Sequence, residues 1–138
     1  MKPLVIDGSM TLGFILKDEH SAQALKTLRE IEKGVPSYVP SHWWLETANG
    51  LIMAERRKRA SLAEVMEALS LLRELPVITD DETAQHCVDA TAALARQYAL
   101  TIYDAAYLEL AIRRKSTLAT TDRQLAKAAM AAGVAVFQ

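Results

Sequence analysis

The feature that most constrains the fold is a series of short apolar segments, separated by longer stretches with helical spacing. Parallel strands need crossover connections, and a helix is the usual crossover. A strand covered by helices on both faces is apolar along its whole length rather than alternating. The pattern predicts an α/β fold, a Rossmann-like three-layer α/β/α sandwich around a mostly parallel sheet of five strands. These strands are expected at residues 4–6, 37–40, 76–78, 116–120 and 134–137.

Capping residues and apolar spacing predict the helices between these strands. Asp18 is a suitable N-cap for a helix that ends at Gly34. Ser61 and Glu64 match a capping box at the start of another helix. A single helix is expected across residues 84–98.

The length of 138 residues fits one hydrophobic core, so residues 1–138 are predicted to form a single domain. The composition, 51% hydrophobic and 24% charged, is that of an ordinary soluble globular protein. We find no repeat, linker or low-complexity tract.

Charge and cysteine content exclude several classes of function. Sixteen basic and seventeen acidic residues give a formal net charge of −1, so any nucleic-acid binding must be local. The lone Cys87 excludes an internal disulfide, and the three histidines show no zinc-ligand spacing. The N-terminus lacks the apolar run of a signal peptide, and no stretch approaches the ~20 apolar residues of a membrane span. These features fit a cytoplasmic protein with no membrane association.

Two acidic residues directly follow predicted strands, where doubly wound folds bind their ligands. Asp7 follows the first strand, and Asp122 follows the fourth. Each also has a purely structural interpretation. Asp7 can form an Asx-turn while Ser9 caps the next helix. Thr121 and Gln124 match a capping box that leaves Asp122 in the first helical turn, where the dipole favours negative charge.

Two further acids lie on helices. Asp104 stands where a helix N-cap belongs, and Glu46 taken alone is a surface glutamate on the helix that starts at Ser41. The joint placement of the four acids is more informative than any one of them. Carboxylates that converge in one crevice raise one another's pKa values unless a cation neutralises them. Because all four side chains are carboxylates and provide only oxygen ligands, the cation should be Mg²⁺ or Mn²⁺.

The order and spacing of these motifs resemble the PIN-domain family over essentially the whole chain, and within it the small VapC-like toxin ribonucleases of toxin–antitoxin pairs. The sequence differs from the usual family pattern at Gly8, where Ala is more common, and at Thr121, where Asn is frequent. The motifs that carry the resemblance are "VIDGSM" (5–10), "WWLETANGL" (43–51), "IYDAAYLELA" (102–111) and "LATTDRQLAKAA" (118–129).

This resemblance implies a metal-dependent endoribonuclease that forms a homodimer and is inhibited by a VapB-like antitoxin. Asp7, Asp104 and Asp122 would hold one or two Mg²⁺ or Mn²⁺ ions, and Glu46 would complete the set. Glu55, on the same helical segment, is the alternative fourth acid.

Other polar residues are candidates for supporting roles. Ser9 and Thr120 could orient a carboxylate or a metal-bound water, although helix capping is the structural alternative. Arg113, Arg114 and Arg123 lie in segments that lead to or from the acids, and could bind RNA phosphates that the acids would repel. Basic runs of this kind are more often solvated helix ends.

Non-catalytic modules on a similar fold are the competing class. A phospho-acceptor domain that binds Mg²⁺ would want a second acid beside Asp7 and a lysine at the end of a late strand. Gly8 follows Asp7, and Lys115 precedes the fourth strand, so neither condition is met. A domain of this fold that binds only RNA or a partner protein remains open at this point.

Overall fold

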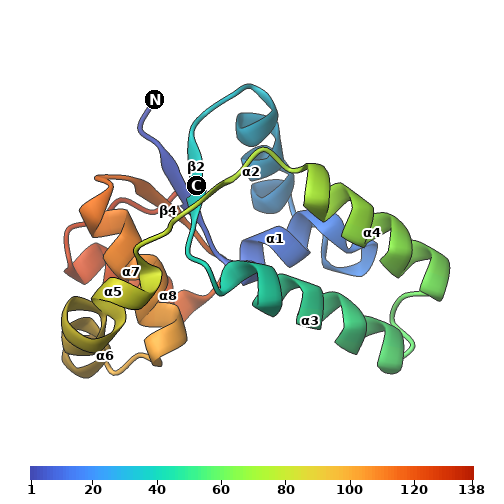
Figure 1. Ribbon diagram of the computed structural model, residues 1–138. Helices are drawn as coiled ribbons and strands as arrows, with labels where there is room; N and C mark the ends of the chain where they lie inside the picture. The colour runs from blue at the N-terminus through green and yellow to red at the C-terminus, as the bar shows by residue number, and fades with distance from the viewer.

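The computed structural model describes all 138 residues and has a central parallel sheet (Figure 1). Its strands are β1 (Leu4–Ile6), β2 (Ser37–Val39), β3 (Ile78–Thr79) and β4 (Thr117–Ala119). All neighbouring pairs are parallel, in the order β3-β2-β1-β4. The predicted α/β fold with helices flanking a parallel sheet is confirmed.

The sheet has four strands rather than the predicted five. Residues 134–137 make only an isolated parallel bridge, between Leu118 and Val136. Leu118 donates its N–H to Ala135 and accepts from the N–H of Phe137. The backbone N–H and C=O groups of successive residues in β4 point to opposite sides. Thr117 therefore donates its N–H to Pro3, and Ala119 accepts the N–H of Asp7, at the two ends of β1. In this three-residue strand only Leu118 directs its backbone groups to the outer edge, so residues 134–137 form a single bridge and not a fifth strand.

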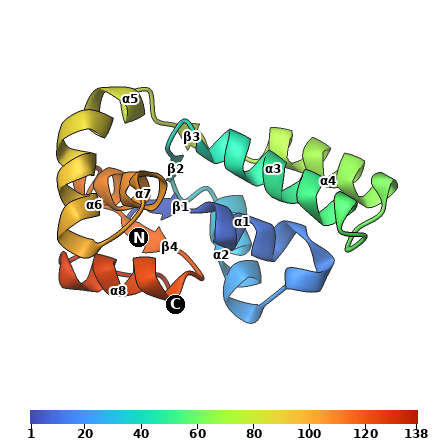
Figure 2. The same cartoon turned by 90° about the horizontal axis from the view of Figure 1, so that it is seen from below.

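Helices cover both faces of the sheet (Figures 1 and 2). The helices α3 and α4 form a hairpin that reaches away from the sheet, as Figure 2 shows. None of the helices is long and apolar enough to cross a membrane. One side carries α1 (Gly8–Ile15), α2 (Ala22–Glu32), α3 (Trp43–Arg56) and α4 (Leu62–Glu74), and the other carries α5 (Thr83–His86), α6 (Ala92–Tyr98), α7 (Ile102–Arg113) and α8 (Arg123–Ala131).

Two helix predictions differ in detail from the structure. Asp18 lies in a 3-10 turn (Lys17–Glu19), and Ser21 caps α2 because its hydroxyl accepts the N–H of Ala24. The single helix expected across 84–98 is instead α5, a π-helical turn (Cys87–Thr91) and α6. Within that turn the Asp89 carboxylate accepts the N–H of the next residue, a local bond that competes with regular helical pairing.

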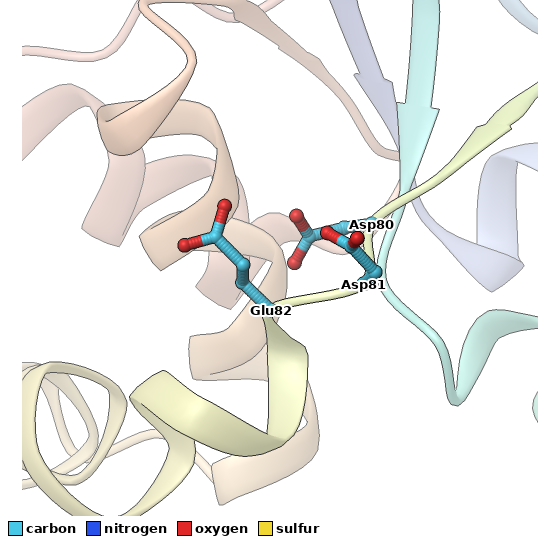
Figure 3. A group of neighbouring side chains, drawn as sticks. All are labelled: Asp80, Asp81 and Glu82. Atoms are coloured by element: carbon cyan, nitrogen blue, oxygen red, sulfur yellow. The ribbon is translucent and has the colours of Figure 1, made fainter.

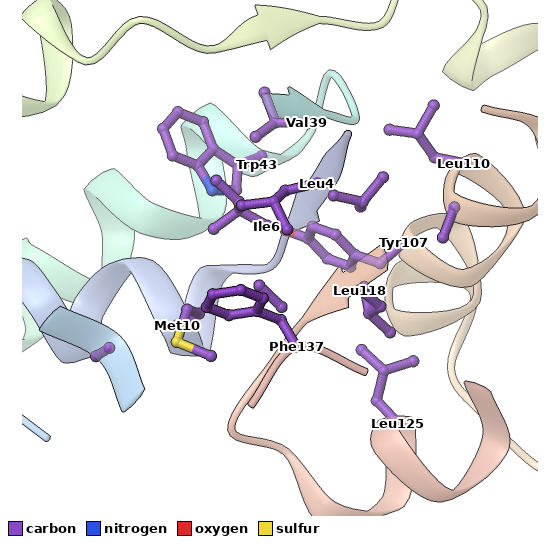
Figure 4. Close-up of a cluster of buried hydrophobic side chains, with 14 of the residues drawn as sticks. Leu4, Ile6, Met10, Val39, Trp43, Tyr107, Leu110, Leu118, Leu125 and Phe137 are labelled. Atoms are coloured by element: carbon purple, nitrogen blue, oxygen red, sulfur yellow. The ribbon is translucent and has the colours of Figure 1, made fainter. Parts of the chain in front are cut away.

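The core lies on both sides of β1, whose residues Leu4–Ile6 are fully buried (Figure 4). Trp43 at the start of α3 and Tyr107 on α7 are the largest fully buried side chains. The Trp43 indole N–H donates to Thr11 Oγ1 at 3.0 Å, so its polar edge is satisfied inside the core. This packing fixes the starts of α1, α3 and α7 around the carboxyl end of β1.

Candidate functional site

Asp7 is the residue at which β1 ends and α1 begins. Its N–H donates to Ala119 at the end of the neighbouring strand, at 3.1 Å. Its Oδ1 accepts the N–H of Met10 at 2.8 Å, so Asp7 itself is the N-cap of α1. The alternative in which Ser9 caps this helix is wrong, because Ser9 lies inside α1 and its hydroxyl points back to Asp7. The Asp7 side chain is almost fully buried.

Two hydroxyl groups hold the Asp7 carboxylate in place. Ser9 Oγ donates to it at 2.8 Å from Oδ1 and 2.9 Å from Oδ2, and Thr120 Oγ1 donates to Oδ2. Ser9 Oγ also accepts the N–H of Thr121, and Thr120 Oγ1 accepts the N–H of Asp122. The predicted supporting residues Ser9 and Thr120 therefore join the end of β1 to the loop after β4.

Glu46, in the first turn of α3, reaches over the start of α1. Its carboxylate occupies the space beside Gly8, since a Cβ built on Gly8 would lie 2.6 Å from Glu46 Oε1. A side chain at position 8 would therefore require the Glu46 carboxylate to shift. Glu55 lies nine residues further along α3, about 13.5 Å away, in a depression that contains Lys58 and Arg59. The structure therefore groups Glu46, and not Glu55, with Asp7.

Asp104 stands in the first turn of α7, and Asp122 immediately precedes α8. Thr101 caps α7 by accepting the N–H of Asp104 at 3.1 Å, so Asp104 is not the cap and its carboxylate is free for another role. Asp122 caps α8 by accepting the N–H of Leu125 at 3.0 Å, which replaces the capping box expected at Thr121.

Electrostatic coupling connects these residues, here called the acid cluster: Asp7, Glu46, Asp104 and Asp122. Burial, with a contribution from Asp104, raises the pKa of Asp7 to about 6. Burial and the charges of Asp7 and Asp104 raise the pKa of Glu46 to about 7. Burial, then the charge of Asp122, raises the pKa of Asp104. Each acid is close enough to another for mutual repulsion, so the structure brings the four together.

Two aromatic residues beside the acid cluster carry polar groups that sequence reasoning left unassigned. The hydroxyl of Tyr107 is buried with no hydrogen-bond partner, and burial with the charges of Glu46 and Asp7 raises its pKa. Tyr107 lies one turn after Asp104, and this i,i+3 spacing could have placed it at the site. His42 Nε2 donates to the Tyr103 carbonyl at 3.1 Å and lies 3.6 Å from Glu46 Oε2.

A second acidic group lies after β3: Asp80, Asp81 and Glu82, whose carboxylate oxygens come within 4.8 Å of one another (Figure 3). Such spacing could hold a cation. However, Arg113 already donates to both oxygens of Asp80, at 2.9 and 2.8 Å, and holds the pKa of that carboxyl below its usual range. We interpret this group as an ion-pair network. In the acid cluster, by contrast, no lysine or arginine pairs with any of the four acids, and only His42 lies near Glu46.

The three arginines considered for RNA binding have different environments. Arg113 is bound by Asp80 and Glu109 and is largely buried, so its guanidinium is already neutralised. Arg114 stacks over the Tyr38 ring at 4.8 Å and is partly exposed. Arg123, in the first turn of α8, is exposed and makes no ion pair. Arg114 and Arg123 are therefore the cations available to a phosphate.

The chain is similar to known proteins over most of its length. The model of the PIN domain matches residues 4–130. A curated protein, Ribonuclease VapC3 from Pyrobaculum aerophilum, is 28% identical over 131 residues, which cover 90% of this chain and 92% of that protein.

Solved structures show the same fold at low sequence identity. PAE2754 from Pyrobaculum aerophilum has a TM-score of 0.68 at 20% identity, over 92% of this chain and 79% of that one. VapBC2 from Rickettsia felis, bound to a DNA fragment from their promoter, has a TM-score of 0.64 at 13% identity, over 96% of each chain. A toxin-antitoxin complex from Klebsiella pneumoniae has a TM-score of 0.56 at 19% identity, over 86% of each chain.

Proposed function

Because the chain belongs to the PIN-domain family, we propose that it is a metal-dependent endoribonuclease that hydrolyses RNA phosphodiester bonds and is inhibited by an antitoxin protein. The observation that carries the proposal is the acid cluster, in which residues 7, 46, 104 and 122 repel one another at the carboxyl end of the sheet. The similarity to a curated ribonuclease supports RNA as the substrate class.

The donor set fits Mg²⁺ or Mn²⁺. All of its ligand atoms are carboxylate oxygens, which hard divalent cations prefer. A cation would offset the burial of charge and the mutual repulsion that raise the pKa values of Asp7 and Glu46. The unpartnered Tyr107 hydroxyl beside these acids offers a donor to a carboxylate or a water molecule. Asp7, Asp104 and Asp122 would hold the ion, and Glu46 would complete the set.

The bound metal would lower the pKa of a water molecule to generate a nucleophile and would offset charge on the leaving oxygen. The side chains of the protein supply the orientation. Ser9 and Thr120 hold the two oxygens of Asp7 in one direction. The Glu46 carboxylate, which also lines the cavity beside the acid cluster, would accept a proton from an attacking water.

We further propose that the protein acts in the cytoplasm as a homodimer paired with a VapB-like antitoxin. Similarity to structures of toxin–antitoxin complexes supports a protein partner. Leu62 and Met66, exposed one turn apart on α4, also support one, because neighbouring exposed apolar side chains can mark interaction sites. Leu71 is exposed on another side of α4, where it borders a cavity of about 290 Å³ between α4 and the end of α1.

The test of the nuclease proposal is incubation of the purified protein with single-stranded and structured RNAs in Mg²⁺, Mn²⁺ or EDTA. We expect cleavage with either metal, none in EDTA, and a loss of at least about a hundredfold in Asp104→Asn, since that variant keeps its size but loses a ligand charge. Asp81→Asn, an exposed acid outside the acid cluster, is the matched control. Wild-type cleavage by Asp104→Asn would refute the assignment.

A further inference from the structure

A cavity of about 470 Å³ opens directly beside the acid cluster, between the starts of α3 and α7. Two of its walls are Glu46 and Asp104 themselves, so a molecule in this cavity would adjoin the proposed metal. The remaining walls are not acidic. They are His42, Leu45, Asn49 and Tyr103.

Two of these wall residues expose apolar surface to solvent. The side chain of Leu45 is 78% exposed and that of Tyr103 is 66% exposed. Both could be polar without loss of core packing, because neither is part of the buried core. Exposed apolar side chains that gather beside a polar site commonly mark a binding surface.

The Tyr103 backbone is held in place although its ring is exposed. The Tyr103 carbonyl accepts a hydrogen bond from His42 Nε2. The His42 ring lies 6.0 Å from the ring of Tyr103 and 5.1 Å from the buried ring of Tyr107, centroid to centroid. Contact with a core residue therefore orients the His42 ring, and the hydrogen bond from that ring holds the Tyr103 backbone in advance, which lowers the entropy lost on binding.

We propose that this cavity binds one unpaired base of the RNA substrate, stacked on Tyr103 and in contact with Leu45. This inference rests on the proposed ribonuclease function. Proteins bind single-stranded RNA by stacking bases on aromatic side chains and bonding their edges to polar groups. The Asn49 amide can both donate to and accept from a base edge. The phosphate next to the bound base would then lie at Glu46 and Asp104.

The arrangement selects single-stranded RNA over duplex RNA. A base in a duplex is already stacked and paired, and its release requires additional free energy. A base in a loop or single strand is free to enter the cavity. The cavity therefore favours cleavage in unpaired regions.

The first experiment compares variants of the two exposed wall residues on a single-stranded oligoribonucleotide that the wild type cleaves. Loss of one stacked base corresponds to about a tenfold or larger loss of affinity. We therefore expect Tyr103→Ala to raise KM about tenfold with kcat nearly unchanged. Tyr103→Phe, which keeps the ring, should retain wild-type KM. Leu45→Ala should raise KM less, and Val88→Ala, an exposed apolar residue between α5 and α6, should have no effect.

The second experiment measures binding without cleavage, by fluorescence anisotropy of the same oligonucleotide in Ca²⁺. An abasic nucleotide next to the cleavage position should weaken binding to the wild type about tenfold, and should not weaken binding to Tyr103→Ala any further. The comparison of two oligonucleotides on two proteins tests whether the base stacks on the Tyr103 ring, and it does not depend on the rate of cleavage.

The outcomes separate this inference from the nuclease proposal. Tyr103-dependent binding without cleavage in Mg²⁺ or Mn²⁺ would keep the base site and refute the nuclease. Cleavage with wild-type KM in Tyr103→Ala would keep the nuclease and overturn the base site. Failure of the wild type to bind single-stranded RNA would also overturn the base site.

Discussion

Burial of Asp7 opposes folding of the metal-free protein at neutral pH. The pKa of Asp7 rises from 3.8 to about 6, so the folded chain binds this proton more tightly than the unfolded chain does. The contribution of Asp7 to the free energy of unfolding therefore decreases as the pH rises from about 4 to 6. Above that range its charged carboxylate destabilises the fold by about 3 kcal/mol. A bound divalent cation would offset this penalty.

Asp7→Asn should therefore stabilise the metal-free protein. The amide carries no charge but loses part of the hydrogen bonding from Ser9 and Thr120, so we expect a gain of about 1–2 kcal/mol at pH 7.5 in EDTA. At pH 4 the gain should disappear, because the wild-type carboxyl is then protonated in the fold. Urea unfolding at the two pH values measures both quantities. A variant less stable than the wild type at pH 7.5 would contradict the burial argument.

At the scale of elements, one ion pair joins α7 to the end of β3. Arg113 in the last turn of α7 donates to Asp80 after β3 and to Glu109 one turn earlier. The guanidinium is largely buried and Asp80 fully so, which makes removal of one partner costly. The network positions α7, and α7 carries Asp104 and Tyr107 into the site.

Arg113→Gln should lower the free energy of unfolding by about 2–3 kcal/mol, between the values for exposed and fully buried pairs. Arg114→Gln is the control and should cost less than about 1 kcal/mol, because the Arg114 guanidinium lies 3.8 Å from Asp80 and is more exposed.

The pKa of Asp80 is lowered, mainly by Arg113. The stabilisation from the Asp80–Arg113 pair is thus fully present above pH 3.8, the pKa of Asp80 in the unfolded chain. It is lost as the pH falls through the lower pKa of Asp80 in the folded protein. Denaturant titrations should therefore show a smaller difference in the free energy of unfolding between the wild type and Arg113→Gln at pH 3 than at pH 7.

Elements were more predictable from the sequence than the contacts between them. The apolar run at residues 4–6 identifies β1, because a strand covered on both faces is apolar along its length. The runs were less exact elsewhere, since β3 is an exposed pair, Ile78–Thr79, and residues 134–137 form only a bridge. Helix caps were less certain, since Asp7 and Ser9 are both good caps. The choice between them depends on Thr120, which is 113 positions from Asp7. Tyr107 was missed for a related reason: its spacing fits ordinary core packing, and only the fold leaves its hydroxyl unpartnered.

At the scale of the whole molecule, the net charge of −1 gives RNA no general attraction. Any electrostatic affinity must come from local cations such as Arg114 and Arg123, near the end of α7 and the start of α8. Each contact with a phosphate of single-stranded RNA contributes about 0.7 to the slope of log affinity against log salt.

Arg123→Ala and Arg114→Ala should each weaken RNA binding and flatten that slope by about 0.7, because one phosphate contact is lost. Binding titrations at several salt concentrations measure the slope. Arg96→Ala, an exposed arginine on α6, is a suitable control and should leave it unchanged. A wild-type slope in both test variants would show that neither arginine contacts the backbone.

The bond between Thr120 and Asp7 also has a consequence for biosynthesis. A ribosome makes Asp7 well before the hydroxyl that orients it, because Thr120 lies 113 positions later in the chain. A nascent chain that has not yet reached Thr120 and Asp122 therefore cannot form the acid cluster. Any activity that depends on this cluster would begin only after both residues have left the ribosome.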